Sequence, residues 1–104
     1  MTKLPGRFLK FKENYPEIFQ AYETLGRAAS DAGPLGKKEI SLVKLGIAAG
    51  AKMEGAVHSH TRRALEAGAS PEEIRHVALL AVTTLGFPNM MAVLSWIDEV
   101  LDKD

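Results

Sequence analysis

Imidazole groups are the side chains of this sequence best suited to proton transfer. The chain contains three histidines, His58, His60 and His76, and no cysteine. An imidazole titrates near neutral pH and can act as a general acid or base, a role worth about 10²–10⁴ in rate when it is well positioned. The absence of cysteine excludes disulfides, thiolate metal ligands and thiol nucleophiles. Any chemistry must therefore proceed without a thiol.

His58 and His60 belong to one expected helix, over about residues 53–67, but they point to opposite sides of it. His60 shares its side with the apolar positions Met53, Ala56, Val57 and Ala64. It should therefore face the interior or a pocket. His58 lies about 200° round the helix, with Glu54 four residues before it and Arg62 four residues after it, on the polar side. Two imidazoles so placed cannot reach one ion at about 2.0–2.1 Å, so the His-x-His pair predicts no metal site.

His60 and the Glu54–His58 pair each have a structural as well as a functional interpretation. His60 is either a core histidine whose ring nitrogens find a carbonyl or hydroxyl partner, or a general acid or base. Glu54 with His58 is either an ordinary surface pair worth a few tenths of a kcal/mol or part of a site at a helix start. His76 shares a face with Glu72 and is most simply a solvated pair.

Lys44 is a cation in the middle of an expected helix, over about residues 35–50, that is apolar on almost every face. It shares one narrow polar stripe with Lys37 and Ser41. The stripe meets either solvent, with the lysine extended to water, or a pocket in which Lys44 binds a substrate carboxylate.

The elements that position these residues are all expected to be helices. Pro16 suits the first turn of a helix that ends near Asp31–Pro34. A weaker amphipathic turn precedes it at residues 8–12. Helices over about 35–50 and 53–67 follow, and Gly68 suits a left-handed cap at the end of the latter.

Two further helices are expected in the last third of the chain. Ser70, Pro71 and Glu73 form a capping-box pattern, which starts a helix that continues to Gly86. Phe87 and Pro88 open a final amphipathic helix. No segment alternates with a period of two, so no sheet is predicted. The expected fold is all-α, a compact bundle of about five to six helices.

Length and composition indicate one ordinary globular domain over 1–104. The 13 basic and 13 acidic residues balance, which argues against nucleic acid and anionic membranes as partners. The N-terminal residues do not have the pattern of a signal peptide, and no apolar run approaches the roughly 18 residues that span a bilayer. We expect a cytoplasmic protein. The expected helices over about 35–50 and 71–86 are both apolar on nearly every face. So small a domain cannot easily bury both of them, which favours a homo-oligomer.

Four segments resemble the carboxymuconolactone decarboxylase family, which includes the alkylhydroperoxidase D-like proteins. They are LGKKEISLV at 35–43, EGAVHSH at 54–60, ALEAGASPEEI at 64–74 and the turn at 86–88. The upstream Tyr15–Ile18 segment also looks like the family's preceding helix. The resemblance implies the alkylhydroperoxidase D-like helical fold and a homo-oligomer, a trimer or hexamer, with sites near subunit contacts.

The peroxidase branch of this family carries a relay glutamate, a Cys-x-x-Cys pair and a histidine. Those positions correspond here to Ser41, Met53, Ala56 and His60. Only the histidine is retained, so thiol peroxidase activity is not expected.

The resemblance to the decarboxylase branch implies a cofactor-free reaction on a small carboxylated or lactone-type molecule. In this picture we expect His60 and Glu54 to be the catalytic residues, with no metal and no cofactor. Lys44, Ser41, Met53 and Ala56 would line the substrate site, and Lys44, Arg62 or Arg63 would hold a carboxylate. The alternative is a non-catalytic oligomeric scaffold or small-molecule binder, in which Met53 fills the old site and His60 is satisfied by a neighbour.

Overall fold

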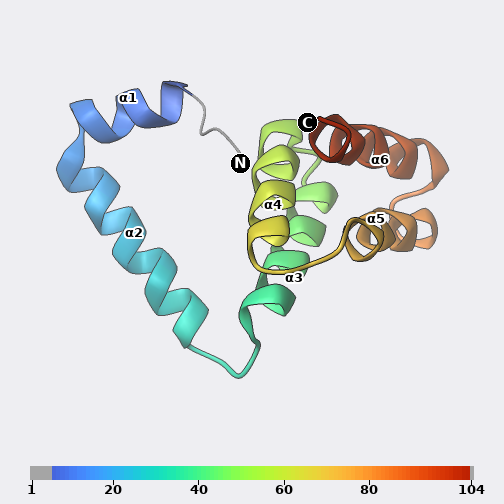
Figure 1. Ribbon diagram of the computed structural model, residues 1–104, viewed down its shortest axis with the longest axis horizontal. Coiled ribbons are helices and arrows are strands. Elements are labelled where there is room, and N and C mark those ends of the chain that lie inside the picture. Colours follow the sequence, from blue (N-terminus) through green and yellow to red (C-terminus); the bar gives the residue numbers. More distant parts are fainter. Residues whose placement is uncertain (1–5, 104) are drawn as a thin grey trace. The chain divides into compact units, whose positions relative to one another are not determined.

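The described part of the chain, residues 6–103 of a computed structural model, consists of helices and connecting turns and contains no strand. The elements are α1 (Gly6–Asn14), α2 (Pro16–Asp31), α3 (Lys37–Gly50), α4 (Glu54–Glu66), α5 (Pro71–Leu80), the 3-10 turn η1 (Ala81–Thr83) and α6 (Phe87–Leu101) (Figure 1). The all-α prediction is confirmed. None of these helices is both long and apolar enough to cross a membrane.

The chain divides into two compact units, one up to Pro34 and one from Leu35 onward. In the first unit, α1 packs on α2 through the rings of Phe8 and Phe19, whose centroids are 5.4 Å apart in an edge-to-face arrangement. Neither helix of this unit contains a buried residue. The expectation of a single domain over the whole chain stays a prediction.

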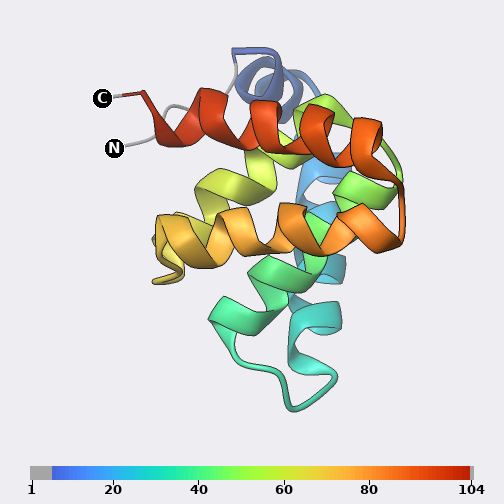
Figure 2. The same ribbon diagram turned by 90° about the vertical axis from the view of Figure 1, so that its right-hand side faces the viewer.

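The core lies in the second unit, where α4 packs against both α3 and α6, and α5 packs against α6 (Figures 1 and 2). Small side chains occupy many of the contact positions, which allows the helices to approach closely. The buried cluster comprises Leu45, Ala48, Ala49, Val57, Ala64, Ala69, Ile74, Ala78, Val93 and Ile97. This arrangement holds α3 and α4, the helices that carry the candidate site residues, side by side.

Ion pairs connect α5 to α3 and to α6. The Lys38 ammonium of α3 donates to Glu73 Oε2 at 3.0 Å. Arg75 donates to Asp98 at 2.8 Å and to Asp102 at 3.1 Å, both on α6. The position of α5 in the bundle is therefore set by charge-assisted hydrogen bonds as well as by Ile74 and Ala78 in the core.

The predicted capping box at the start of α5 is confirmed. Ser70 Oγ accepts from the Glu73 backbone N–H at 3.0 Å, and the Glu73 carboxylate accepts from the Ser70 backbone N–H at 2.9 Å. Gly68 and Gly86 have φ of +97° and +93°, which an L side chain would adopt only with strain. The helix α4 thus ends just before Gly68, as the local pattern predicted, whereas Gly86 is the N-cap residue of α6.

One boundary prediction was wrong. The fourth expected helix was extended to Gly86, but α5 ends at Leu80 and is followed by the short turn η1. The β-branched residues Val82, Thr83 and Thr84 have low helix propensity. In this stretch Thr84 N–H donates to the Ala81 carbonyl at 3.1 Å, the tighter 3-10 register.

Replacing Glu73 with glutamine is expected to reduce the acid sensitivity of folding. The Ser70 backbone N–H and the Lys38 ammonium lower the pKa of Glu73 in the folded state. Its stabilising contribution is therefore complete above the ordinary carboxyl range and is lost as pH falls through the lowered pKa. Glutamine keeps the capping bond but does not titrate.

Urea unfolding at about pH 7 and about pH 3 measures this effect. The free energy of unfolding should fall more steeply with acid for the wild type than for Glu73→Gln. Equal losses in both proteins would show that the Glu73 carboxylate does not contribute.

The helices α3 and α5, which were expected to be apolar on nearly every face, are only partly buried. Each places one face in the core, α3 through Leu45 and α5 through Ile74. Large apolar side chains stay exposed on their other faces and on the segments that follow them: Val43, Ile47, Met53, Leu79, Leu80, Val82, Phe87 and Met91. Within the described chain these faces stay uncovered, as expected for two nearly all-apolar helices in a domain of this size.

Candidate functional site

His60 lies in the middle of α4 with its ring partly buried. Val57 and Ala64, one turn before and one turn after it, are fully buried. The Nδ1 atom of His60 is buried and forms no hydrogen bond within the described chain. The ring therefore faces inward, as the helical phase indicated, but it lacks the neighbouring carbonyl or hydroxyl that a structural core histidine would have.

Two cations act on this imidazole. Burial is the main cause that lowers the pKa of His60, and the charges of Arg63 and Lys44 lower it further. Arg63 lies three residues after His60 on α4, and Lys44 comes from the adjacent helix α3. At neutral pH the imidazole is mainly uncharged and has cations in its surroundings, a setting that favours binding of an anionic group.

The remaining predicted site residues are distributed unevenly around His60. Ala56 is half-buried one turn before it on α4, and Ser41 is half-buried three residues before Lys44 on α3. Met53 precedes α4 as its N-cap residue and is 57% exposed. Met53 is therefore not part of the buried core of the described chain, and the scaffold hypothesis, in which it fills the old site, stays a prediction.

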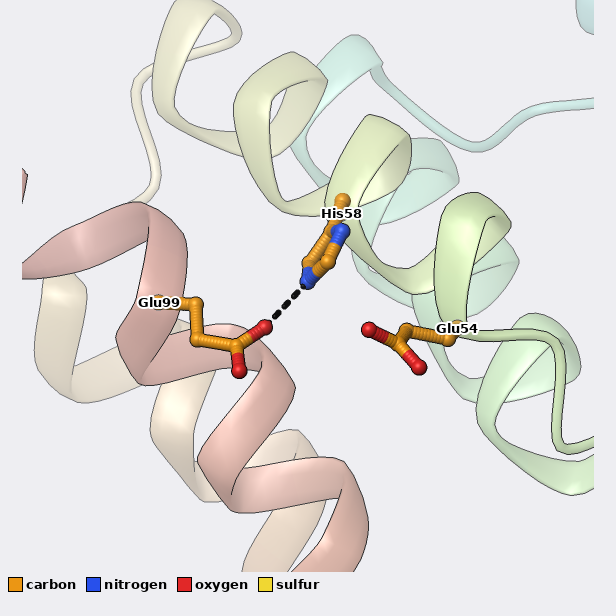
Figure 3. A group of neighbouring side chains, drawn as sticks. All are labelled: Glu54, His58 and Glu99. Carbon is orange, nitrogen blue, oxygen red and sulfur yellow. Dashed lines mark hydrogen bonds and ion pairs between the residues drawn. The ribbon is translucent and has the colours of Figure 1, made fainter.

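Glu54, the other predicted catalytic residue, belongs to a second group of polar side chains. The His58 Nε2 atom lies 2.7 Å from Glu99 Oε1 on α6, and the Glu54 carboxylate points toward this pair (Figure 3). One ligand atom from each of the three residues lies within 4.8 Å of the other two. The structure thus places Glu54 with His58 and Glu99 and does not bring it to His60.

Sequence reasoning missed Glu99. The local pattern identified Glu54 and His58 as an i, i+4 pair but gave Glu99, in the final amphipathic helix, no role in a site. The partner lies 41 residues from His58 in the sequence, so no local pattern connects them. The helical phase predicted that His58 and His60 would belong to different sites. The group of possible metal ligands, Glu54, His58 and Glu99, accordingly does not include His60.

His76 lies apart from both groups. It is exposed on α5 and borders an open depression that also involves Glu72 and Leu79. No acidic residue or histidine of the described chain joins Glu72 and His76 to form a third potential metal ligand. The interpretation of this pair as a solvated surface pair stays a prediction.

Comparison with known proteins places this sequence in a family. The sequence pattern of the Carboxymuconolactone decarboxylase family matches residues 16–99. The chain belongs to the carboxymuconolactone decarboxylase family. An uncharacterized protein of Methanocaldococcus jannaschii is 32% identical over 89 residues, which cover 86% of this chain and 83% of that protein. No solved structure matches the chain.

As a member of the carboxymuconolactone decarboxylase family, this protein has no thiol with which to carry out peroxidase chemistry. The two positions expected to correspond to the cysteine pair lie at the start of α4, with Met53 exposed and Ala56 half-buried. The inward-facing imidazole of His60 and its neighbouring cations are the chemically capable groups that this part of the fold retains.

Proposed function

We propose that this protein binds a small carboxylated or lactone-type molecule beside His60 and decarboxylates it without a cofactor. The observation that carries the proposal is the buried, unpaired Nδ1 of His60, which has the cations Lys44 and Arg63 in its surroundings. Leaving a buried polar atom without a partner costs roughly 1–3 kcal/mol. A bound molecule that hydrogen-bonds to the imidazole would offset this cost.

The cations define the class of ligand. Lysine and arginine both bind carboxylates through charge-assisted hydrogen bonds. Loss of CO₂ breaks a carbon–carbon bond and leaves an electron pair on the substrate carbon, which must then accept a proton. His60 would relay that proton, and the cations would hold the anionic group in place. Membership of the carboxymuconolactone decarboxylase family supports this reaction class.

Turnover of carboxymuconolactone by the wild type and by Lys44→Gln tests the proposal. Loss of one charge-assisted hydrogen bond is worth roughly 1.5–3 kcal/mol, so kcat/KM should fall about 10- to 150-fold, mostly through KM. Lys37→Gln is the matched control, since it removes an exposed charge two turns earlier on the same helix. The control should behave as the wild type.

Two results would count against the enzyme. Saturable binding of the lactone without CO₂ release would favour the non-catalytic binder. Equal losses for Lys44→Gln and Lys37→Gln would remove Lys44 from the site.

We also propose that the protein is cytoplasmic and self-associates, as a trimer or hexamer. The support for self-association is the set of large apolar side chains that a single chain leaves exposed on α3, α5 and α6. Sedimentation velocity would measure the assembly, and a monomer at micromolar concentration would contradict the expectation.

A further inference from the structure

We propose that Glu54, His58 and Glu99 form a binding site for a divalent transition-metal ion, with Zn²⁺ as the best-suited probe. This inference goes beyond the proposed function and does not depend on it. It concerns the opposite side of α4 from the one that His60 occupies, and it uses none of the groups assigned to the substrate.

The geometry of the three side chains is close to that of a metal site. Glu54 and His58 are four residues apart on α4, so both project from the same side of the helix. Glu99 reaches this side from α6, the helix that packs against α4 (Figure 3). The three ligand atoms lie within 4.8 Å of one another.

Only small movements would bring these atoms to one ion. Bonds of about 2.0–2.2 Å in a tetrahedral arrangement place neighbouring ligand atoms about 3.3 Å apart. The His58–Glu99 pair would open slightly from its 2.7 Å contact, and the Glu54 carboxylate would move inward. Both glutamates are exposed, so their side chains can rotate without disturbing the core.

The donor atoms determine which ion fits. One imidazole nitrogen and two carboxylates suit Zn²⁺ and its first-row neighbours, while Mg²⁺ and Ca²⁺ prefer all-oxygen sites. Two carboxylates compensate the charge of a divalent ion. Three protein ligands leave at least one coordination position for water or another molecule, as in open zinc sites.

A simpler role for the same residues is an ion pair that connects α4 to α6. The His58–Glu99 contact alone is consistent with such a pair, but it gives no role to Glu54, whose carboxylate points toward the contact (Figure 3). Metal binding should depend on all three side chains, whereas an ion pair between α4 and α6 requires only two. This difference makes Glu54 diagnostic.

The test is a Zn²⁺ titration of the untagged, chelator-treated full chain against a chromophoric competitor. The wild type should bind one equivalent per chain. Glu54→Gln, His58→Gln and Glu99→Gln should each lower the affinity at least about tenfold, since even outer-shell changes cost 10- to 100-fold. Co²⁺ substitution should give visible absorption bands in the wild type that each variant weakens.

The chain contains its own matched control. Glu72 and His76 repeat the Glu-x-x-x-His spacing on α5, without a third histidine or acidic ligand in the described chain. His76→Gln should therefore leave Zn²⁺ affinity unchanged. Glu99→Gln retains the shape of the side chain and a hydrogen-bonding partner for His58, so it should fold even if His58→Gln does not.

The proposal fails if the wild type binds Zn²⁺ no more tightly than Glu99→Gln. It also fails if His76→Gln lowers the affinity as much as His58→Gln, because the ion would then bind histidines in general. Unchanged affinity in Glu54→Gln would reduce the group to an ion pair. Retained lactone turnover in His58→Gln and Glu99→Gln would show that the metal site and the His60 site are separate.

Discussion

Replacing His60 with glutamine is expected to lower kcat for carboxymuconolactone by about 10²- to 10⁴-fold, the range typical for loss of a positioned acid or base. The imidazole has a buried, unpaired Nδ1 and is mainly uncharged at neutral pH, so it can exchange a proton with a bound molecule. Glutamine retains hydrogen-bonding capacity but cannot accept and release a proton in this pH range. The measurement is initial CO₂ release at saturating substrate.

The matched control for this experiment is His76→Gln, which removes an exposed imidazole on α5. It should retain wild-type kcat. Circular dichroism should show that both variants keep their helical content, since His60 is only partly buried. If His60→Gln turned over the substrate as fast as the wild type, the imidazole would have no part in the reaction.

Replacing Leu45 with alanine is expected to lower the free energy of unfolding by about 2–5 kcal/mol. Leu45 is fully buried in the cluster that joins α3 to the other helices of the second unit. Truncation removes apolar contacts and leaves a cavity that the rigid helix backbones fill only partly. Urea unfolding monitored by circular dichroism measures the change.

Ile47→Ala is the matched control for Leu45→Ala. Ile47 lies two residues further along α3 and is 66% exposed in the single chain, so its truncation should change the stability of the dissociated monomer by less than about 0.5 kcal/mol. The sequence alone makes the two positions look alike, since α3 is apolar on almost every face. A cost for Ile47→Ala as large as that for Leu45→Ala would mean that this face of α3 is covered in solution.

The local elements of this protein could be predicted because their causes lie close together in the sequence. The capping box of Ser70 and Glu73 depends on residues three apart, and the turns at Gly68 and Gly86 depend on one residue each. Helical periodicity was enough to place His60 on an inward face and His58 on a different one. The exception, the early end of α5, occurs where β-branched residues replace good helix formers.

The composition of the candidate sites could not be predicted in the same way. Periodicity shows which face of a helix a residue occupies, but not which residue of another helix will oppose it. The crossing of α4 and α6 brings Glu99 to His58 across 41 residues, and the packing of α3 on α4 brings the charge of Lys44 to His60. These contacts depend on how the core side chains of several helices pack against one another.

The sequence by itself determined the helical class of this protein, its main caps, the family to which it belongs and the absence of a thiol from its chemistry. The tertiary structure decided that Glu54 lies with His58 and Glu99, that His60 Nδ1 is buried without a partner, and which apolar faces stay exposed. The physical reason is the range of the interactions. Hydrogen bonds and steric preferences along one helix are local, whereas the contacts between helices form only when the whole core packs.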